Sequence, residues 1–435
     1  MWRRVLLVFG LCMLPIVASH ATLEITVTRG VNTAVPVAIV PFGWEVQGPA
    51  PSTDVAAVIG ADLTRSGRFK AIPDKSMLEK PTQASAINFT NWRILAVNDL
   101  VIGRIKPAGS NYQVEFQLFN VYTGQQLLGL SILTTPQGLR WTAHKISDLI
   151  YQKLTGQQGA FATRIAYVEI SGKGGKDSHY ALVVADSDGA NPQTVFESSQ
   201  PIMSPDWSPD GKYIAYVSFE SGLPAIYMQD IYTGKRELLS ERRGLNSAPA
   251  FSPDGKSLAM VLSSSPGNPD IYVMDLATHK LRRITHSEAI DTEPTWSPDG
   301  RSLYFTSDRG GSPQIYKVSL SGGAPQRITF DGNYNARSRI SPDGKTLAMV
   351  HRENGQLRIA VMNLNTGALL TLTDGSLDKS PSFAPNGGMI IYEADYHDRG
   401  VLAEVSVDGQ VSERLSESQR GVSVYAPVWG PFLSQ

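Results

Sequence analysis

Hydrophobic and polar residues alternate in short runs along the second half of the chain, and a turn follows nearly every run. In one such unit, residues 294–297 form a short apolar run that ends at Pro298-Asp299-Gly300, a tripeptide suited to a tight turn. Three further strands rich in aromatic and β-branched residues follow at 302–307, 314–318 and 326–329. Four strands in a unit of about 44 residues predict one blade of a β-propeller.

The turn of this unit recurs along the chain with nearly constant spacing. Ser-Pro-Asp-Gly stands at 208–211, 252–255, 297–300 and 341–344, Ala-Pro-Asn-Gly stands at 384–387, and Trp429-Gly430-Pro431 ends the series. A bulky residue precedes each copy, at intervals of 43 to 46 residues: Trp207, Phe251, Trp296, Ile340, Phe383 and Trp429. Self-similarity at this period indicates a repeat architecture.

The two ends of the repeat array complement each other. Residues 164–168 have the pattern of a second strand without a first, whereas residues 427–430 have the pattern of a first strand with nothing after it. We expect the C-terminal segment to complete the blade that begins at Arg164, which closes a ring of six blades and leaves no exposed central edge. The alternative is an open array of similar hairpins.

The region from residue 22 to residue 155 has a different pattern and predicts a small α/β domain. A buried strand is expected at 35–42, a helix that is capped from within Pro51-Ser52-Thr53-Asp54 and continues to about Gly67, and a second helix from about Leu139 to Leu154. Further strands are expected near 69–72, 100–105 and 112–121. We therefore predict an α/β N-terminal domain (22–155), a short linker, and an all-β six-bladed β-propeller closed by the C-terminal strand (160–435).

The first 21 residues have the features of a cleavable signal peptide. Arg3 and Arg4 precede the apolar run 5–17, and small residues stand three before and one before a cut after Ala21. The run is too short to span a bilayer and Pro15 interrupts it, so no membrane span is expected. Cys12 is the only cysteine, which leaves the mature chain without a disulfide, a thiol nucleophile or a cysteine metal site.

Composition narrows the class of protein further. The chain has 435 residues, of which 42% are hydrophobic and 18% charged, and its formal net charge is -1. These values are typical of a near-neutral globular protein with room for two domains. Because there is no basic excess, a nucleic-acid partner is not expected.

The motifs of common catalytic sites are absent from the sequence. No Gly-x-Ser-x-Gly elbow, His-Glu-x-x-His pair, phosphate-binding loop or dinucleotide fingerprint occurs, and the histidines show no ligand spacing, so neither an enzyme nor a cofactor is predicted. The blade aspartates are expected to bond backbone N–H groups of their own turns, and the tryptophans of the first strands to fill the core. These residues are Asp210, Asp254, Asp299 and Asp343, and Trp207, Trp296 and Trp429.

One face of the predicted ring is the candidate functional region. The loops that enter each first strand converge around the channel mouth, while the Pro-Asp-Gly turns lie on the other face. These loops span 199–204, 245–248, 289–293, 333–337, 377–380 and 422–426. Loops held on a rigid scaffold around a concave rim commonly bind ligands or partner proteins.

Several phrases, taken in order, carry a resemblance to a known family. They are Val40-Pro41-Phe42, Ala61-Asp62-Leu63-Thr64-Arg65-Ser66-Gly67, Lys153-Leu154-Thr155-Gly156, Thr163-Arg164-Ile165-Ala166-Tyr167-Val168, Tyr272-Val273-Met274-Asp275-Leu276 and Gly323-Ala324-Pro325-Gln326-Arg327-Ile328-Thr329. With the signal peptide, the α/β domain and the six blades, the chain resembles over essentially its whole length the TolB family, the periplasmic propeller proteins of the Tol–Pal system. The Ser-Pro-Asp-Gly phrase alone is shared by many propellers, whereas the ordered combination is specific.

The resemblance implies two protein partners in the periplasm. The lipoprotein Pal would bind at the propeller mouth, and the C-terminal domain of the inner-membrane protein TolA would bind the mature N-terminus, an alternating segment that can add as a strand to a sheet edge. The Pal-binding positions are Leu245, Asn246, Ala248, Asp291, Thr292, Glu293, Asn335 and Arg337. The TolA-binding positions are Thr22, Leu23, Glu24, Ile25, Thr26 and Val27.

The resemblance also implies a biological role. The protein would be a monomeric, non-enzymatic adaptor that supports outer-membrane integrity and invagination during cell division, and other outer-membrane proteins and colicins could engage it. Leu245 departs from the family because some members have a polar His there, and Ser338 and Ile340 depart by replacing a proline and an aromatic residue. If the N-terminal segment also docks on its own body, Pal could shift that equilibrium through its different affinities for the two states.

Two other functions stay open at the level of sequence. A propeller lyase or hydrolase would need converging acid–base groups at the mouth, where Asp291, Glu293 and Arg337 are the charged candidates. A glycan-binding module would need exposed aromatic rings, and only Tyr334 and Tyr425 offer them on the rim. Some TolB-like channels hold a metal ion such as calcium, and this sequence does not decide the matter.

Overall fold

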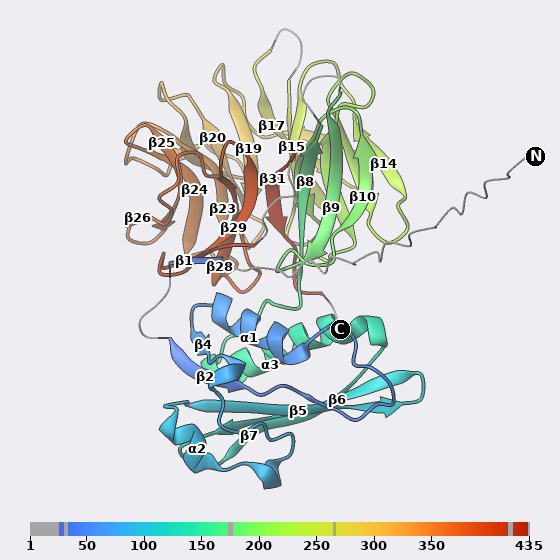
Figure 1. The fold of residues 1–435 in the computed structure, drawn as a ribbon. Coiled ribbons are helices and arrows are strands. Elements are labelled where there is room, and N and C mark those ends of the chain that lie inside the picture. Colours follow the sequence, from blue (N-terminus) through green and yellow to red (C-terminus); the bar gives the residue numbers. More distant parts are fainter. Residues whose placement is uncertain (1–25, 30–33, 173–176, 264–266, 416–420, 434–435) are drawn as a thin grey trace, which may run out of the picture.

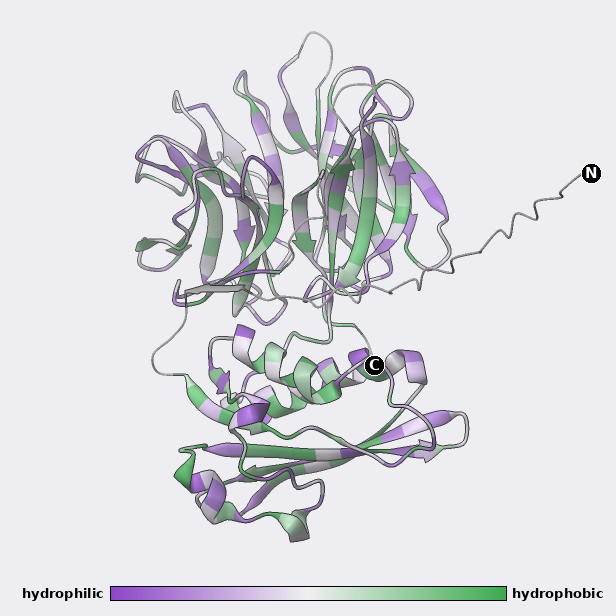
Figure 2. Ribbon diagram, in the orientation of Figure 1, coloured by the Kyte–Doolittle hydropathy of each residue, from purple (hydrophilic) through white to green (hydrophobic). Residues whose placement is uncertain are grey.

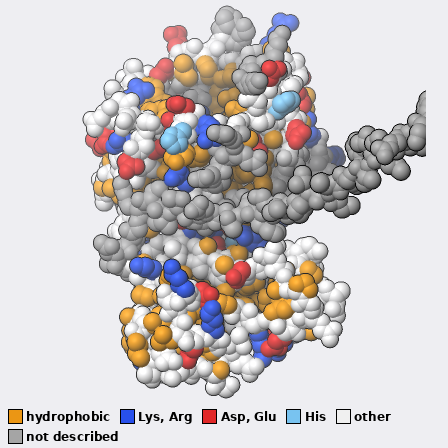
Figure 3. All heavy atoms as spheres, in the orientation of Figure 1, with side chains coloured by type: hydrophobic (Ala, Val, Ile, Leu, Met, Phe, Trp, Pro, Cys, Tyr) orange, Lys and Arg blue, Asp and Glu red, His pale blue; other side chains and the backbone are white. Residues whose placement is uncertain are grey.

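A computed structural model describes residues 26–29, 34–172, 177–263, 267–415 and 421–433 of the chain (Figure 1). The predicted signal peptide and the first four predicted TolA-binding residues, Thr22 to Ile25, lie outside these ranges. Within the described part of the chain, no helix is long and apolar enough to cross a membrane. Two lobes are visible, a ring of sheets and a smaller domain below it (Figures 1 and 3).

Six sheets radiate around one axis and form the propeller, which confirms the predicted fold class (Figure 1). Each sheet is an antiparallel meander whose first strand lies nearest the axis. Blade 1 contains β31 (Val422–Trp429), β8 (Arg164–Ser171), β9 (His179–Asp186) and β10 (Gln193–Ser198); blade 2 contains β11 (Ile202–Trp207), β12 (Tyr213–Ser218), β13 (Ala225–Asp230) and β14 (Arg236–Ser240); blade 3 contains β15 (Asn246–Phe251), β16 (Ser257–Leu262), β17 (Asp270–Asp275) and β18 (Leu281–Arg283). Blade 4 contains β19 (Asp291–Trp296), β20 (Ser302–Ser307), β21 (Gln314–Ser319) and β22 (Gln326–Arg327); blade 5 contains β23 (Asn335–Ile340), β24 (Thr346–Glu353), β25 (Gln356–Asn363) and β26 (Leu369–Thr371); blade 6 contains β27 (Lys379–Phe383), β28 (Met389–Asp395), β29 (Gly400–Ser406) and β30 (Ser412–Arg414).

The C-terminal strand closes the ring in the predicted way. β31 pairs antiparallel with β8, and Trp429 lies opposite Ile165 in that register. The backbone N–H of Gly430 donates to the carbonyl of Arg164 at 2.7 Å, so the pairing continues to the end of the strand. Because the C-terminal strand β31 and β8 belong to one sheet, blade 1 has its innermost strand and the ring is closed.

The turns after the first strands of blades 2 to 5 are each built by their own serine and aspartate. In blade 2, the Ser208 hydroxyl donates to Asp210 Oδ1 at 2.6 Å, and Asp210 also accepts from the backbone N–H of Lys212 at 3.1 Å. Gly211 has φ +69°, a conformation that costs glycine little. Asp254, Asp299 and Asp343 repeat the same bonds, so the blade aspartates have the structural role expected from the sequence.

The N-terminal domain is a single sheet with two long helices on one face and a short helix on the other. The strand order is β4-β2-β5-β6-β7, and β3 pairs with β5; β2 is parallel to β4 and β5, whereas β5, β6 and β7 are antiparallel. The strands are β2 (Val35–Ile39), β3 (Gly43–Trp44), β4 (Phe69–Ala71), β5 (Asp99–Ala108), β6 (Asn111–Asn120) and β7 (Gln126–Thr134). The helices are α1 (Val55–Arg65), α2 (Phe89–Ile94) and α3 (Leu139–Thr155), with short 3-10 turns at Asp74–Ser76, Ala84–Ala86 and Pro136–Gly138.

Local chemistry explains the two long helices. Asp54 caps α1 by accepting the backbone N–H of Ala57 at 3.0 Å, and the apolar face of α1 includes the fully buried Ile59 and Leu63. α3 ends at Gly156, which has φ +77° and bonds back to the carbonyl of Gln152. Both helices lie between the sheet and the propeller, so they face the ring as well as their own domain (Figure 1). Hydrophobic stretches on strands and helices mark the two cores (Figure 2).

The sequence pattern missed β7 and α2, in addition to the two-residue strand β3. β7 was not expected because its apolar residues form a run without strict alternation, and Gly129 interrupts it. α2 was not expected because a helix of six residues leaves almost no periodic signal. Neither omission changes the fold class, since β7 extends an existing antiparallel edge.

The N-terminal domain rests on the face of the propeller that carries the Ser-Pro-Asp-Gly turns. Gln157 Nε2 donates to the carbonyl of Asn386 at 2.7 Å, and Asn386 Nδ2 donates to the carbonyl of Gln158 at 3.0 Å. Asn386 belongs to the turn of blade 6. The loops that enter the first strands therefore lie on the opposite, free face of the ring (Figure 1).

Candidate protein-binding mouth of the propeller

The innermost strands share a backbone irregularity near the mouth. One non-glycine residue in each has positive φ, between 46° and 55°, and the strand pairing shifts register there. The six residues are Ser204, Ala248, Glu293, Arg337, Ser380 and Ala426, and a proline follows five of them. Each bulge turns its side chain toward the channel axis, and all six line a narrow cavity of about 60 Å³.

This ring of residues stores backbone strain. A left-handed conformation at a non-glycine residue costs of order 1–3 kcal/mol, and it persists only where the surrounding structure imposes it. Here, a following proline with a fixed φ stands at five of the six positions, and the pairing of the two inner strands holds the flanks. Strain at six symmetry-related positions around one opening is typical of a functional site rather than of a general feature of strands.

Two charged residues of the ring neutralise each other. Arg337 Nε donates to Glu293 Oε1 at 2.9 Å, and the Arg337 backbone N–H donates to Glu293 Oε2 at 3.0 Å. The Thr306 hydroxyl donates to the same carboxylate at 2.9 Å, and Arg337 Nη1 donates to the Ser380 hydroxyl at 2.6 Å. This network ties blades 4, 5 and 6 together at the mouth.

Three of the predicted Pal-binding residues are fully buried. Asp291 forms a two-point ion pair with Arg309, with both distances 2.8 Å. Asn246 accepts from the Ser240 hydroxyl at 2.7 Å and from the Arg242 backbone N–H at 3.0 Å. Asn335 bonds Gln314, His351 and the carbonyl of Asp331. These side chains fix the loops from within, so any part they have in binding is through loop position and not through direct contact.

The other predicted positions reach the surface of the mouth. Leu245, Ala248 and Thr292 are half-buried, and Leu245 and Ala248 pack on the core between blades 3 and 4. Glu293 and Arg337 are also partly exposed beside them. The structure therefore brings these five residues together on the face that the sequence predicts.

Exposed apolar side chains on the same face were missed by sequence reasoning. Phe330 is 70% exposed and Ile290 is 48% exposed, although both lie in loops that adjoin inner strands. Leu223 and Leu377 are also exposed in loops on this face, and Met203 is exposed near the start of β11. The sequence could have indicated these residues, because a large apolar residue inside a predicted polar loop is expected at the surface.

The deeper channel holds a partly buried acid. Asp206 accepts the backbone N–H of Phe251 at 2.8 Å and lines a lower cavity together with Arg339. Burial raises the pKa of Asp206 to about 6, while the charge of Arg339 opposes that rise. A carboxylate and a guanidinium thus stand in one channel.

The geometry does not favour the two alternative functions. The acid–base candidates Asp291, Glu293 and Arg337 are held in ion pairs with fixed partners, so none is poised for proton transfer. Trp296 Nε1 donates to the carbonyl of Ala250 and Trp429 Nε1 donates to Thr163 Oγ1, both at 2.9 Å, and both rings are buried. Tyr425 bonds the carbonyl of Ile202, and Tyr334 lies under Arg352. The aromatic residues considered for a glycan platform therefore already have hydrogen-bond or stacking partners within the protein.

A second candidate element is the N-terminal strand. β1 (Thr26–Arg29) pairs antiparallel with β30 and forms a fifth, outermost strand of blade 6, with Thr26 opposite Arg414 and Val27 opposite Glu413. Thr26 and Val27 are the two predicted TolA-binding residues within the described part of the chain. The segment is thus docked on its own propeller by main-chain pairing.

Three residues with metal-binding side chains meet between the domains. Asp62, His144 and Asp188 are buried, and one potential ligand atom from each lies within 4.8 Å of the others. Asp62 Oδ1 lies 3.3 Å from Arg65 Nε, and Asp188 is bonded by Arg140 Nη2. Because both carboxylates already have guanidinium partners, the cluster is an ionic joint between α1, α3 and blade 1 rather than a cation site.

Comparison with known proteins gives a consistent result. A family model described as the TolB β-propeller domain matches residues 151–433, and one described as the TolB amino-terminal domain matches residues 23–127. The chain belongs to the TolB family. Curated relatives called Tol-Pal system protein TolB from Xanthomonas euvesicatoria and Xanthomonas oryzae are 50% identical over 417 residues, covering 95% of this chain and 94% of theirs.

A solved structure extends the likeness to three dimensions. The crystal structure of TolB from Acinetobacter baumannii is 41% identical, has a TM-score of 0.86, and covers 94% of this chain and 100% of its own. That coverage includes both domains, so the TolB likeness is not confined to the repeats. The resemblance read from the ordered phrases is therefore confirmed.

Proposed function

We propose that this TolB-family protein is a non-enzymatic periplasmic adaptor of the Tol–Pal system, which binds Pal at the propeller mouth and the TolA C-terminal domain through its N-terminal segment. The observation that carries the proposal is the free face of the ring, where strained loops and exposed apolar side chains surround a narrow opening. The names of the curated relatives support membership of the Tol–Pal system. Supporting outer-membrane integrity and invagination during cell division is part of the same proposal.

The shape and chemistry of the mouth suit a protein partner. Its cavity of about 60 Å³ is far below the 300–1,000 Å³ of typical small-molecule pockets. The apolar residues stand around the opening rather than inside it, as in the core of a protein–protein interface. The Glu293–Arg337 network can accept a partner's polar groups at the centre without a change of blade geometry.

The N-terminal segment fits recognition by strand addition. Its pairing with β30 shows that the segment can form an edge strand, and TolA would compete for the same main-chain groups. We therefore propose that the docked segment is unavailable to TolA, and that Pal shifts the docking equilibrium only if it binds the docked and free states with different affinities.

Binding measurements with purified Pal and the TolA C-terminal domain test the division of labour. Full-length mature protein should bind both partners, and deletion of residues 22–33 should abolish TolA binding while leaving Pal affinity unchanged. Replacing Ile290 with Asp should weaken Pal binding at least tenfold without affecting TolA. Leu238→Asp is the matched control, since Leu238 is 45% exposed but lies on the outer strand of blade 2. Equal losses for the two aspartate variants, or loss of both partners on truncation, would contradict the proposal.

A further inference from the structure

Two glutamates lie side by side beneath the N-terminal domain. Glu404 on β29 and Glu413 on β30 are direct cross-strand partners in blade 6, and both side chains are almost completely buried, with Glu413 only 1% exposed. Like charges directly opposite each other on neighbouring strands repel. Two ionised carboxylates in this position would also lack the water that normally stabilises them.

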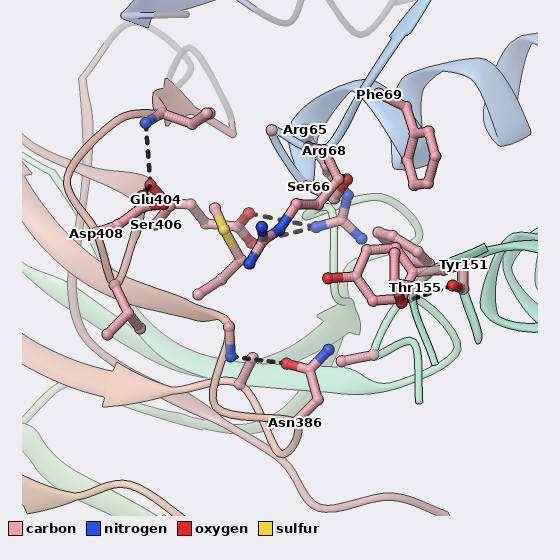
Figure 4. Close-up of a pocket in the computed structure, with 18 of the residues that line it drawn as sticks. Arg65, Ser66, Arg68, Phe69, Tyr151, Thr155, Asn386, Glu404, Ser406 and Asp408 are labelled. Atoms are coloured by element: carbon pink, nitrogen blue, oxygen red, sulfur yellow. Dashed lines mark hydrogen bonds and ion pairs between the residues drawn. The ribbon is translucent and has the colours of Figure 1, made fainter. Parts of the chain in front are cut away.

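In the part of the chain that the structure describes, Arg65 is the cation that acts on both carboxyl groups. Arg65, at the end of α1, reaches across the domain boundary and bonds both oxygens of Glu404, at 3.2 and 3.4 Å (Figure 4). The same guanidinium bonds the Ser187 hydroxyl at 2.6 Å and Asp62 at 3.3 Å. Among the described residues, neither oxygen of Glu413 has a hydrogen-bond partner. One guanidinium for two buried carboxyls means that the pair is held most stably with one proton.

Burial and the neighbouring carboxylates favour the protonated form of the pair. Burial raises the pKa of Glu404 to about 8 and that of Glu413 to about 7, with Arg65 opposing the rise at both. Asp62 on α1 and Asp188 in the turn after β9 raise the pKa of Glu413 further. The other charged groups of the joint are Arg140 and His144 on α3, and Asp54 and Asp74 farther out along the cavity that Glu413 lines.

The unpaired glutamate lies at the edge that the N-terminal strand covers. Glu413 is opposite Val27 of β1 on one side and opposite Glu404 on the other. β30 has only three residues, so β1 is bound to a short edge whose central position is this acid. A change in the charge of Glu413 therefore acts at the centre of the docking site.

We propose that the Glu404–Glu413 pair is a proton-operated latch for the N-terminal strand: the pair keeps a proton while β1 lies on β30 and α1 covers the joint, and loss of that proton favours release of β1. An exposed glutamate ionises near pH 4.5, so docking takes up a proton above that pH and weakens progressively as pH rises toward 7. Protonation of His144 has the same effect on the stability of the joint. Burial alone would lower its pKa, but the charges of Asp62 and Asp188 outweigh burial and raise it, so the imidazolium form stabilises the joint at low pH.

Hydrogen exchange of the full mature chain, measured by mass spectrometry of the peptide that contains residues 26–29, tests the latch. After correction for the intrinsic effect of pH on exchange, protection of this peptide should fall between pH 5.5 and pH 8. The upper limit of the fall is about 30-fold, which corresponds to a pKa of about 7 in the docked state and 4.5 after release. Glu413→Gln, a neutral side chain of the same shape, should keep the acidic-pH protection at pH 8. Glu197→Gln is the matched control, because Glu197 is exposed on the outer strand β10 of blade 1.

Two results would overturn the latch. One is wild-type protection that does not change between the two pH values, and the other is a Glu413→Gln protein whose pH profile follows the wild type. Exchange of the β27 and β28 peptides is measured in the same samples, so a general loosening of blade 6 is distinguished from release of β1 alone. Neither Pal nor TolA is present in the experiment, so its failure would leave the proposed partners untouched.

Discussion

Replacement of Trp429 with Ala tests the closure of the ring, on which the position of every mouth loop depends. Trp429 is buried on β31, in the core shared by blades 1 and 6. Its indole Nε1 donates to Thr163 Oγ1 at 2.9 Å, and its backbone N–H donates to the Ser382 hydroxyl at 3.0 Å. The substitution removes the indole side chain and its hydrogen bond to Thr163, but it leaves the backbone hydrogen bond to Ser382 in place.

The magnitude follows from these contacts. Truncation of a buried Trp to Ala costs about 3–5 kcal/mol, because transfer energy is lost and a cavity remains. The lost bond to Thr163 adds about 1 kcal/mol. Since a domain of this kind is stabilised by about 5–15 kcal/mol in total, the variant should lose a large fraction of the propeller's free energy of unfolding.

Urea denaturation followed by far-UV circular dichroism measures the effect. Trp429→Phe keeps the aromatic volume but not the N–H donor, so it should lose only about 1–2 kcal/mol. Trp44→Ala is the control for indole loss elsewhere, because Trp44 is half-buried in the N-terminal domain. A free energy of unfolding for Trp429→Ala within about 1 kcal/mol of the wild type would show that the closing strand does not hold the ring, and the reasoning would fail.

Two further outcomes concern buried charges near the mouth and in the channel. Arg309→Ala should lower the free energy of unfolding by about 3–5 kcal/mol, because it leaves the buried Asp291 carboxylate without its partner. The double variant Arg309→Ala/Asp291→Asn should recover most of this loss. A denaturation measurement that shows no recovery would contradict the pairing. Asp206→Asn should stabilise the protein by roughly 2–3 kcal/mol at pH 8 and have little effect at pH 4. The sign follows because burial raises the pKa of Asp206 to about 6, so its ionisation opposes folding above that pH; thermal melts that show equal effects at both pH values would refute this.

The candidate site was predicted only in outline. Loops entering the first strands could be identified because Trp207 and its counterparts recur with a constant interval, which also fixes which end of each blade faces the mouth. Burial of Asn246, Asp291 and Asn335 could not be predicted, since a polar residue in a loop pattern has the same signature whether it bonds its own loop or a partner. The exposed Phe330 was overlooked for the converse reason, because aromatic residues in strand-rich chains are usually core.

Periodicity and turn chemistry by themselves determined the repeated blades, the closing strand and the order of the two domains, because those depend on residues close together in the sequence or on matching end fragments. Only the tertiary structure decided which charges share a buried environment. Glu404 and Glu413 face each other on two neighbouring strands of the last blade, and Arg65 of an N-terminal helix reaches them only because the N-terminal domain rests on the turn face. Electrostatic energy depends on distance and burial rather than on sequence separation, so no local sequence pattern predicts such a cluster.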